Sequence, residues 1–258
     1  MHVVRRGTGK PLLMVHGLGS SLHNWDRIVP GLSAERELIL IDLPGFGQTP
    51  PLPGEVTIAT LTDALQESMQ AHGLGTVDIV GSSMGARMVV ELARRGHAGT
   101  TIALDPGGFW NDRQAMVFGA SIKASVALVR TIQPLLPALT GNPVGRTALL
   151  AQFSAAPWKL PAALVLTELR GFDASPSLDE ALRSLVKGPR QQGAPAGSLN
   201  GRLVLVWGKQ DKVTLPSQAR TAMRLFPDAT LQLIDKCGHF PHWDQPEQTV
   251  RLILDSTA

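Results

Sequence analysis

A serine bracketed by glycines stands between a short apolar run and a helical pattern, which restricts this part of the chain to a very tight turn. Residues 77–80 are typical of a buried strand, residues 81–85 read Gly-Ser-Ser-Met-Gly, and residues 86–95 are typical of a helix. Only small residues fit beside the central position of so sharp a strand-to-helix turn. The turn holds the Ser83 hydroxyl clear of the sheet, at the start of a helix whose free N–H groups favour negative charge. Ser83 is therefore a candidate nucleophile.

Short aliphatic runs alternate with helical patterns along most of the chain. The runs predict strands over residues 12–15, 38–41, 77–80, 101–104, 203–207 and 230–234. The patterns between them predict helices over residues 21–32, 58–71, 86–95 and 216–225, and a last helix from residue 245. Short buried runs separated by helices favour parallel strands covered on both faces. The predicted fold class is α/β, with a mostly parallel central sheet flanked by helices.

The alternation stops after Gly108. From there to about Asn200 the sequence has helical patterns, many prolines and no convincing strand. We expect a core made of residues 1–106 and 201–258, with residues 107–200 forming an inserted helical cap. Such an insert would lie over the carboxyl ends of the strands, where open α/β sheets bind ligands.

Composition narrows the class of protein further. With 258 residues, 43% hydrophobic and 17% charged, the chain fits a globular domain and not a disordered or fibrous one. Its net charge is only +3, and the arginines alternate with acids, so nothing indicates a nucleic-acid partner. Cys237 is the one cysteine, which excludes an intrachain disulfide. No signal-peptide pattern or membrane span is expected, and cytoplasmic is the predicted location; the oligomeric state stays open.

A serine nucleophile needs a base and a group that orients the base. His239 follows the last predicted strand, so we expect it at the same edge of the sheet as Ser83. Three acids could orient it. Asp211 follows the penultimate strand, Asp105 ends the strand that comes after the helix at residues 86–95, and Asp235 is close to His239 in sequence. We favour Asp211, which is expected at the same edge of the sheet, over Asp105, whose alternative role is that of a turn-forming residue before Pro106.

The oxyanion of an acyl-transfer intermediate needs two preorganised N–H donors. Met84 offers its backbone N–H at the start of the helix, and the glycine-flanked Leu18 is the expected second donor. His16 is interpreted as a structural residue of that loop. Phe109 and Trp110 are the preferred candidates for substrate contacts. Further residues considered for an apolar pocket or a substrate carboxylate are Trp25, Phe118, Phe153, Trp158, Phe172 and Arg87, for which packing roles are favoured.

Five ordered landmarks resemble those of the α/β-hydrolase fold superfamily. They are His16-Gly17, the loop Asp42-Leu43-Pro44-Gly45-Phe46-Gly47, the pentapeptide around Ser83, Trp207-Gly208 with Asp211, and Gly238-His239. Their order, Ser then Asp then His, is that of the superfamily. The resemblance covers nearly all of the expected core but not the cap. It implies Ser83 as nucleophile, His239 as base, Asp211 as orienting acid, and Leu18 and Met84 as oxyanion donors.

The resemblance implies a serine carboxylesterase that cleaves small to medium esters through an acyl-enzyme, with no cofactor or metal. Superfamily members with an aspartate nucleophile, the haloalkane dehalogenases and epoxide hydrolases, fit poorly because this chain has Ser83. Carbon–carbon bond hydrolases of ring-cleavage products and perhydrolase-like enzymes remain alternatives. The former commonly have tryptophan after the catalytic histidine, where this chain has Phe240. A ligand receptor without turnover is a third hypothesis.

Overall fold

A computed structural model describes residues 1–258, and a single seven-stranded sheet organises them. The strands, in spatial order, are β1 (Val3–Arg6), β3 (Arg36–Ile41), β2 (Lys10–Val15), β4 (Asp78–Ser82), β5 (Thr101–Leu104), β6 (Leu203–Gly208) and β7 (Thr230–Ile234). Only the edge strand β1 runs antiparallel to its neighbour; all other pairs are parallel. The predicted α/β class with a mostly parallel sheet is confirmed.

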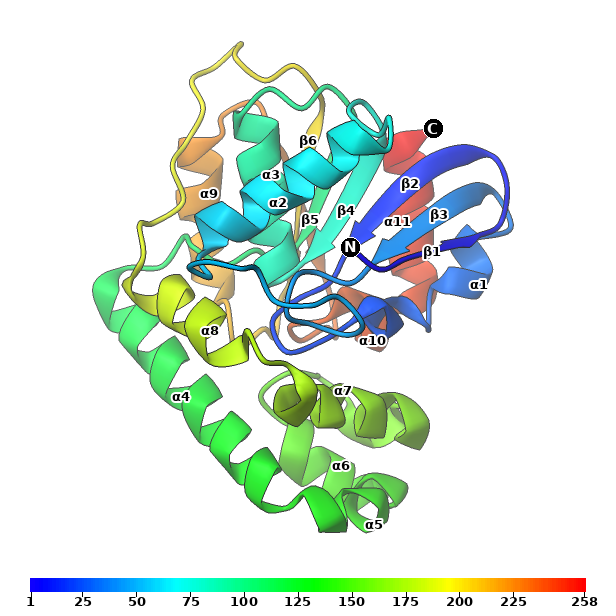
Figure 1. The fold of residues 1–258 in the computed structure, drawn as a ribbon, viewed down its shortest axis with the longest axis vertical. Coiled ribbons are helices and arrows are strands. Elements are labelled where there is room, and N and C mark those ends of the chain that lie inside the picture. The colour runs from blue at the N-terminus through cyan, green and yellow to red at the C-terminus, as the bar shows by residue number, and fades with distance from the viewer.

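The central strands bury both of their faces. In β2, Leu12 and Met14 belong to one apolar cluster, while Leu13 and Val15 belong to the other. Successive side chains of a strand point to opposite faces, so an unbroken apolar run requires cover on both sides. Residues of α1 (Val29–Leu32) and α11 (Pro246–Thr257) pack in the smaller cluster. Residues of α2 (Ile58–Ala71), α3 (Met84–Arg94) and α9 (Ala219–Leu225) pack in the larger one (Figure 1).

Between β5 and β6 the chain forms helices and no strand. These are α4 (Asp112–Thr131), α5 (Leu136–Gly141), α6 (Pro143–Leu150), α7 (Ala162–Ala174) and α8 (Leu178–Lys187). We call residues 112–187 the helical segment. Figure 1 shows it beside the edge of the sheet to which the strand arrows point. Its apolar side chains join the larger cluster, so the segment shares a continuous core with the sheet.

One local prediction was wrong, and two short elements were not predicted. The helix expected over residues 21–32 is a 3₁₀ turn at Leu22–Trp25 followed by the four-residue α1. Pro30 lacks an N–H and its ring clashes with a preceding carbonyl, so one continuous helix cannot run through it. Strand β1 was not predicted, because an edge strand with exposed Arg5 and Arg6 has no buried alternation. A short helix, α10 (Pro241–Asp244), also precedes α11.

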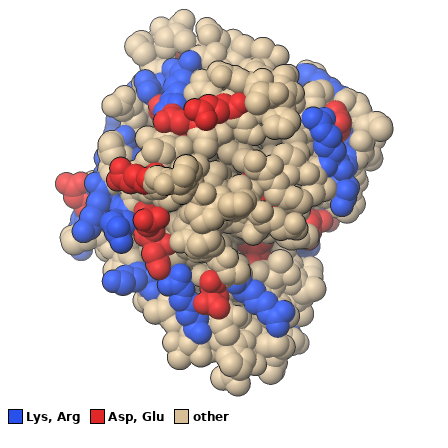
Figure 2. Space-filling model, viewed as in Figure 1, with Lys and Arg blue, Asp and Glu red and all other residues tan.

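Charged side chains of both signs are interspersed on the face shown in Figure 2. Testing each helix for length and hydropathy finds none that would cross a membrane by itself. One pair, α4 with residues Gln133–Gly141, passes the same test only when joined, and it is bent by 72°.

Candidate active site

The turn between β4 and α3 forces Ser83 into an uncommon backbone conformation, with φ 54° and ψ −110°. A side chain at Gly81 would place Cβ 2.5 Å from the carbonyl oxygen of Gly85. A Cβ at Gly85 would lie 2.4 Å from the carbonyl oxygens of both Val15 and His16. Both glycines are therefore required by close backbone contacts, and the strain they allow presents the serine at the end of β4.

Three side chains from separate strand ends form a continuous hydrogen-bonded chain. Ser83 Oγ lies 2.8 Å from His239 Nε2, and His239 Nδ1 lies 2.9 Å from Asp211 Oδ2. His239 and Asp211 are both buried. The His239 backbone N–H also donates to the carbonyl of Phe153, in the helical segment, at 2.7 Å. This geometry suits transfer of the serine proton to Nε2 while the carboxylate holds the Nδ1 proton.

Hydrogen bonds from neighbouring groups hold the Asp211 carboxylate in place as an acceptor. Its Oδ1 accepts hydrogen bonds from the backbone N–H groups of Val213 and Thr214, and its Oδ2 accepts one from the Thr214 hydroxyl. Burial alone would raise the pKa of Asp211, but the His239 ring and the bond from the Thr214 hydroxyl help to lower it below its ordinary value. The carboxylate is therefore charged at neutral pH and can stabilise an imidazolium.

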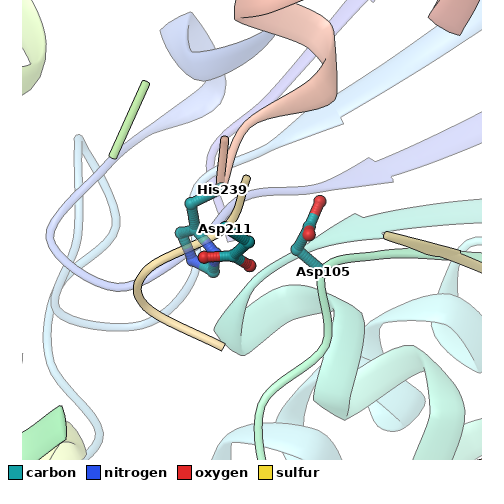
Figure 3. A group of neighbouring side chains, drawn as sticks. All are labelled: Asp105, Asp211 and His239. Atoms are coloured by element: carbon teal, nitrogen blue, oxygen red, sulfur yellow. The ribbon is translucent and has the colours of Figure 1, made fainter. Parts of the chain in front are cut away.

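Asp105 lies close to the same pair but makes no hydrogen bond to His239. Its Oδ1 accepts from the Gly208 N–H at 2.9 Å. Burial and the neighbouring Asp211 raise the pKa of Asp105 well above its ordinary value. Figure 3 shows Asp211 beside the His239 ring and Asp105 on an adjacent strand end. Asp235, the third acid considered, pairs with Lys209 at 2.8 Å on the surface.

Ligand atoms of Asp105, Asp211 and His239 all lie within 4.8 Å of one another, a spacing that a metal ion can bridge. The closest pair, His239 Nδ1 and Asp211 Oδ2, is already joined by a hydrogen bond. Burial and the neighbouring Asp211 raise the pKa of Asp105, which favours the neutral form of its carboxyl group. Within this cluster the structure has one side-chain hydrogen bond, between His239 and Asp211, while Asp105 accepts from the Gly208 N–H.

Two backbone N–H groups beside Ser83 have no protein acceptor: those of Leu18 and Met84. Gly17 brings the first of them close, because a Cβ at Gly17 would lie only 3.1 Å from the Ser83 Cβ. His16 fixes this loop, with Nδ1 donating to the Gly17 carbonyl and Nε2 accepting from the Leu43 N–H. Burial lowers the pKa of His16, so it acts here as a neutral ring.

A small cavity of about 40 Å³ adjoins Ser83 and His239. Most of its wall is apolar, and most of the apolar side chains come from the helical segment or from α10 and its flank. The lining residues are Gly17, Leu18, Ser20, Ser83, Phe118, Ile122, Leu150, Phe153, Glu168, Leu169, Phe172, Val213, His239, Phe240 and Trp243.

Several candidates from the sequence lie elsewhere. Phe109 packs edge-on against Trp207 and Phe226, and Trp110 stacks on Phe118 at 4.6 Å, so neither lines the cavity beside Ser83. Arg87 is buried, donates to the Pro189 carbonyl and lines a separate cavity of about 560 Å³ between α2, α3 and α8. Trp25 and Trp158 also lie outside the wall.

Several wall residues were not among the candidates from the sequence, for example Leu169, Phe240, Trp243 and Glu168. The first three are ordinary apolar residues in helical surroundings, and no motif distinguishes them from core positions. Glu168 carried a weak signal, because it is a lone acid in the apolar stretch Ala-Leu-Val-Leu-Thr-Glu-Leu of α7. A buried acid in such a stretch needs a partner or a function.

The sequence family is now established. The model of the alpha/beta hydrolase family matches residues 12–252, and the chain belongs to that family. Membership supports an enzyme of the hydrolase class. Relatives include a 2-hydroxy-6-oxononadienedioate/2-hydroxy-6-oxononatrienedioate hydrolase of Dechloromonas aromatica. It is 24% identical, over 99% of this chain and 89% of the relative. A 2-hydroxy-6-oxo-6-phenylhexa-2,4-dienoate hydrolase of Burkholderia cepacia is 24% identical, and the match covers 100% of this chain and 91% of the relative.

Solved structures share the fold. A thermophilic esterase from Thermogutta terrifontis superposes with a TM-score of 0.76 at 20% identity, covering 100% of this chain and 94% of the esterase. A meta-cleavage product hydrolase from Pseudomonas fluorescens gives a TM-score of 0.72 at 21% identity, covering 98% of this chain and 92% of that hydrolase. These identities support the shared architecture alone, so substrate must be argued from the site itself.

Proposed function

We propose that this protein is a serine hydrolase of small to medium carboxylic esters that works through an acyl-enzyme. The observation that carries the proposal is the hydrogen-bonded chain from Ser83 Oγ through the His239 ring to Asp211, at 2.8 and 2.9 Å. Binding a ligand does not require such an alignment, whereas nucleophilic catalysis does. This favours an enzyme over a ligand receptor on the same fold.

In the proposed reaction, Ser83 Oγ attacks the ester carbonyl carbon while His239 Nε2 takes the hydroxyl proton. The carbonyl oxygen becomes an oxyanion that the free N–H groups of Leu18 and Met84 stabilise. His239 returns the proton to the leaving alcohol as the tetrahedral intermediate collapses to an acyl-serine. Water then adds by the same steps, releases the acid and restores the Ser83 hydroxyl.

We propose further that the helical segment acts as a cap that selects substrates. It supplies Phe118, Ile122, Leu150, Phe153 and other apolar residues of the cavity wall. A free volume of about 40 Å³ admits only a small group. Larger acyl chains would therefore require the cap to shift, which makes chain-length preference a property of this segment.

Carbon–carbon bond hydrolysis is the second candidate, because two relatives matched over nearly their whole length are named for such dienoate or dienedioate substrates. Those substrates are carboxylates. The cavity beside Ser83 is lined by no Lys or Arg, and its one acid outside the hydrogen-bonded chain is Glu168. A carboxylate substrate would enter an apolar pocket without a counter-charge, at a large desolvation cost. The charge of the wall thus favours neutral or cationic esters.

The test compares the wild type with Ser83→Ala on a series of p-nitrophenyl esters of increasing acyl length. We expect kcat/KM to fall by about 10³-fold or more, since the nucleophile acts as a unit with its base. Ser82→Ala, one residue away in the same turn, is the matched control and should retain activity. Equal turnover by the Ser83→Ala protein would refute the assignment. Faster turnover of a ring-cleavage product than of any ester would favour the second candidate.

A further inference from the structure

Glu168 is a carboxyl group buried in the wall of the cavity that holds Ser83 and His239. Only 7% of the residue is exposed, and it projects from α7 of the helical segment. The proposed mechanism gives it no part. It is also the only ionisable group that lines the cavity apart from His239.

Both hydrogen bonds to this carboxyl group fall on one of its oxygens. The Ser20 hydroxyl donates to Oε2 at 2.8 Å, and the Asn24 side-chain amide donates to Oε2 at 3.2 Å. The amide is held in that orientation because its own oxygen accepts from His242 Nε2 at 2.9 Å. Burial lowers the pKa of His242 to about 3, so the ring is neutral and has one N–H to give.

The second oxygen, Oε1, is buried and has no hydrogen-bond partner. A buried acceptor without a partner costs about 1–3 kcal/mol, and more when it is charged. A contact that only fastens α7 to the core needs Oε2 alone, and a glutamine would provide it. The free Oε1 therefore points to a donor that arrives from outside the protein.

We propose that Glu168 forms a polar subsite of the substrate pocket, which binds a hydrogen-bond donor, a hydroxyl or an ammonium group, carried by the ester. This inference rests on the proposed function and narrows its substrate class. Apolar side chains such as Leu169 and Phe172 flank Glu168 in the wall, so the donor would be carried on an apolar chain. In such surroundings a hydrogen bond to a charged group is stronger than in water.

The experiment uses three methyl esters with equal numbers of heavy atoms: heptanoate, ω-hydroxyhexanoate and ω-aminohexanoate. A matching set with shorter chains allows for the unknown position of the bound donor. The quantity measured is the ratio of kcat/KM for each donor ester to that of the apolar ester. We compare the wild type, Glu168→Gln and the control Glu180→Gln, which alters an exposed acid on α8.

In the wild type we expect the ratio to exceed one for at least one donor ester. At a pH above the pKa of about 7 that burial gives Glu168, where its carboxylate is charged, Glu168→Gln should lower that ratio by about tenfold or more. The loss should come mainly through KM, because the substitution removes the acceptor charge but keeps the side-chain volume. Glu180→Gln should leave the ratio unchanged. A larger effect on the amino ester identifies an ammonium as the preferred donor, and a larger effect on the hydroxy ester identifies a neutral hydroxyl. Thermal unfolding verifies that each variant is folded.

The same ratio in the wild type and Glu168→Gln would overturn the subsite, and so would an equal loss in Glu180→Gln. If the wild type hydrolyses none of the esters, the proposed function fails while the subsite can still be judged. Calorimetry on Ser83→Ala protein then compares binding of the amino, hydroxy and apolar esters without turnover. Tighter binding of a donor ester that is lost on adding Glu168→Gln would support the subsite, and equal binding would refute it.

Discussion

The edge of the sheet and the helical segment contribute to the site in different ways. At the sheet edge, backbone geometry dictates what each residue can be: Gly81 and Gly85 touch neighbouring carbonyl groups, and Ser83 sits at positive φ. In the helical segment, side-chain packing shapes a small apolar wall, and backbone constraint varies from one glycine to the next. A Cβ added at Gly141 would meet no atom within 4 Å, whereas one at Gly145 would lie 2.2 Å from the carbonyl oxygen of Leu139. We therefore propose that the edge sets the chemistry and that the segment tunes the choice of substrate.

The largest expected effect tests which acid orients His239 at the edge of the sheet. Asp211→Asn should lower kcat/KM by about 10³–10⁴-fold, because the amide favours the wrong tautomer of His239. Asp105→Asn should cost less than about tenfold, since Asp105 makes no hydrogen bond to His239, and its raised pKa favours a neutral carboxyl group that an amide resembles. Steady-state kinetics on one activated ester measures both. A greater loss from Asp105→Asn would reverse the assignment.

A matched pair of glycine substitutions tests the contrast in backbone constraint. Gly85→Ala should destabilise the fold by about 2–4 kcal/mol, because its Cβ meets two backbone oxygens that cannot move independently. Gly141→Ala, at the end of α5, should be neutral or stabilise by up to about 1 kcal/mol. Urea unfolding gives both free energies. Similar values for the two variants would show that the backbone at Gly85 is no more constrained than at the open position Gly141.

The smallest expected effect is the contribution of Glu168, in the helical segment, to the pH dependence of the free energy of unfolding. Burial raises the pKa of Glu168 from 4.5 to about 7, so between these values the folded state binds more protons than the unfolded state. The free energy of unfolding should therefore fall as pH rises through that window, and level off above it. Glu168→Gln does not titrate, so its stability relative to the wild type should rise by up to about 3 kcal/mol across the window. Parallel curves for the two proteins would contradict a raised pKa.

The same contrast explains how much could be predicted from the sequence. The bounds of α2, β5 and β7 were predicted to the residue, and the α/β class followed from short apolar runs. Ser83, His239 and Asp211 were found as candidates because strand ends and small residues leave a local pattern. Each of these signals is short-range, since tight turns admit few residue types.

The wall of the cavity left no such pattern. Phe109 follows the strand that ends near Ser83, yet it packs against Trp207 and Phe226 in the core. Phe153 and Trp243, far apart in the chain, come together only after the helical segment folds over the sheet edge. Apolar residues at helical spacing look alike in sequence, so their tertiary contacts decide which of them face a substrate.

Covalent labelling with a fluorophosphonate, followed by mass spectrometry of the peptides, tests directly whether Ser83 is the nucleophile. We expect one adduct per chain, located on Ser83, with no adduct on Ser82 and none in the folded Ser83→Ala protein. Asp211→Asn should be labelled more slowly, since the serine is activated through His239. A folded wild-type protein that stays unlabelled, or one labelled equally after Ser83→Ala, would contradict this assignment of the nucleophile.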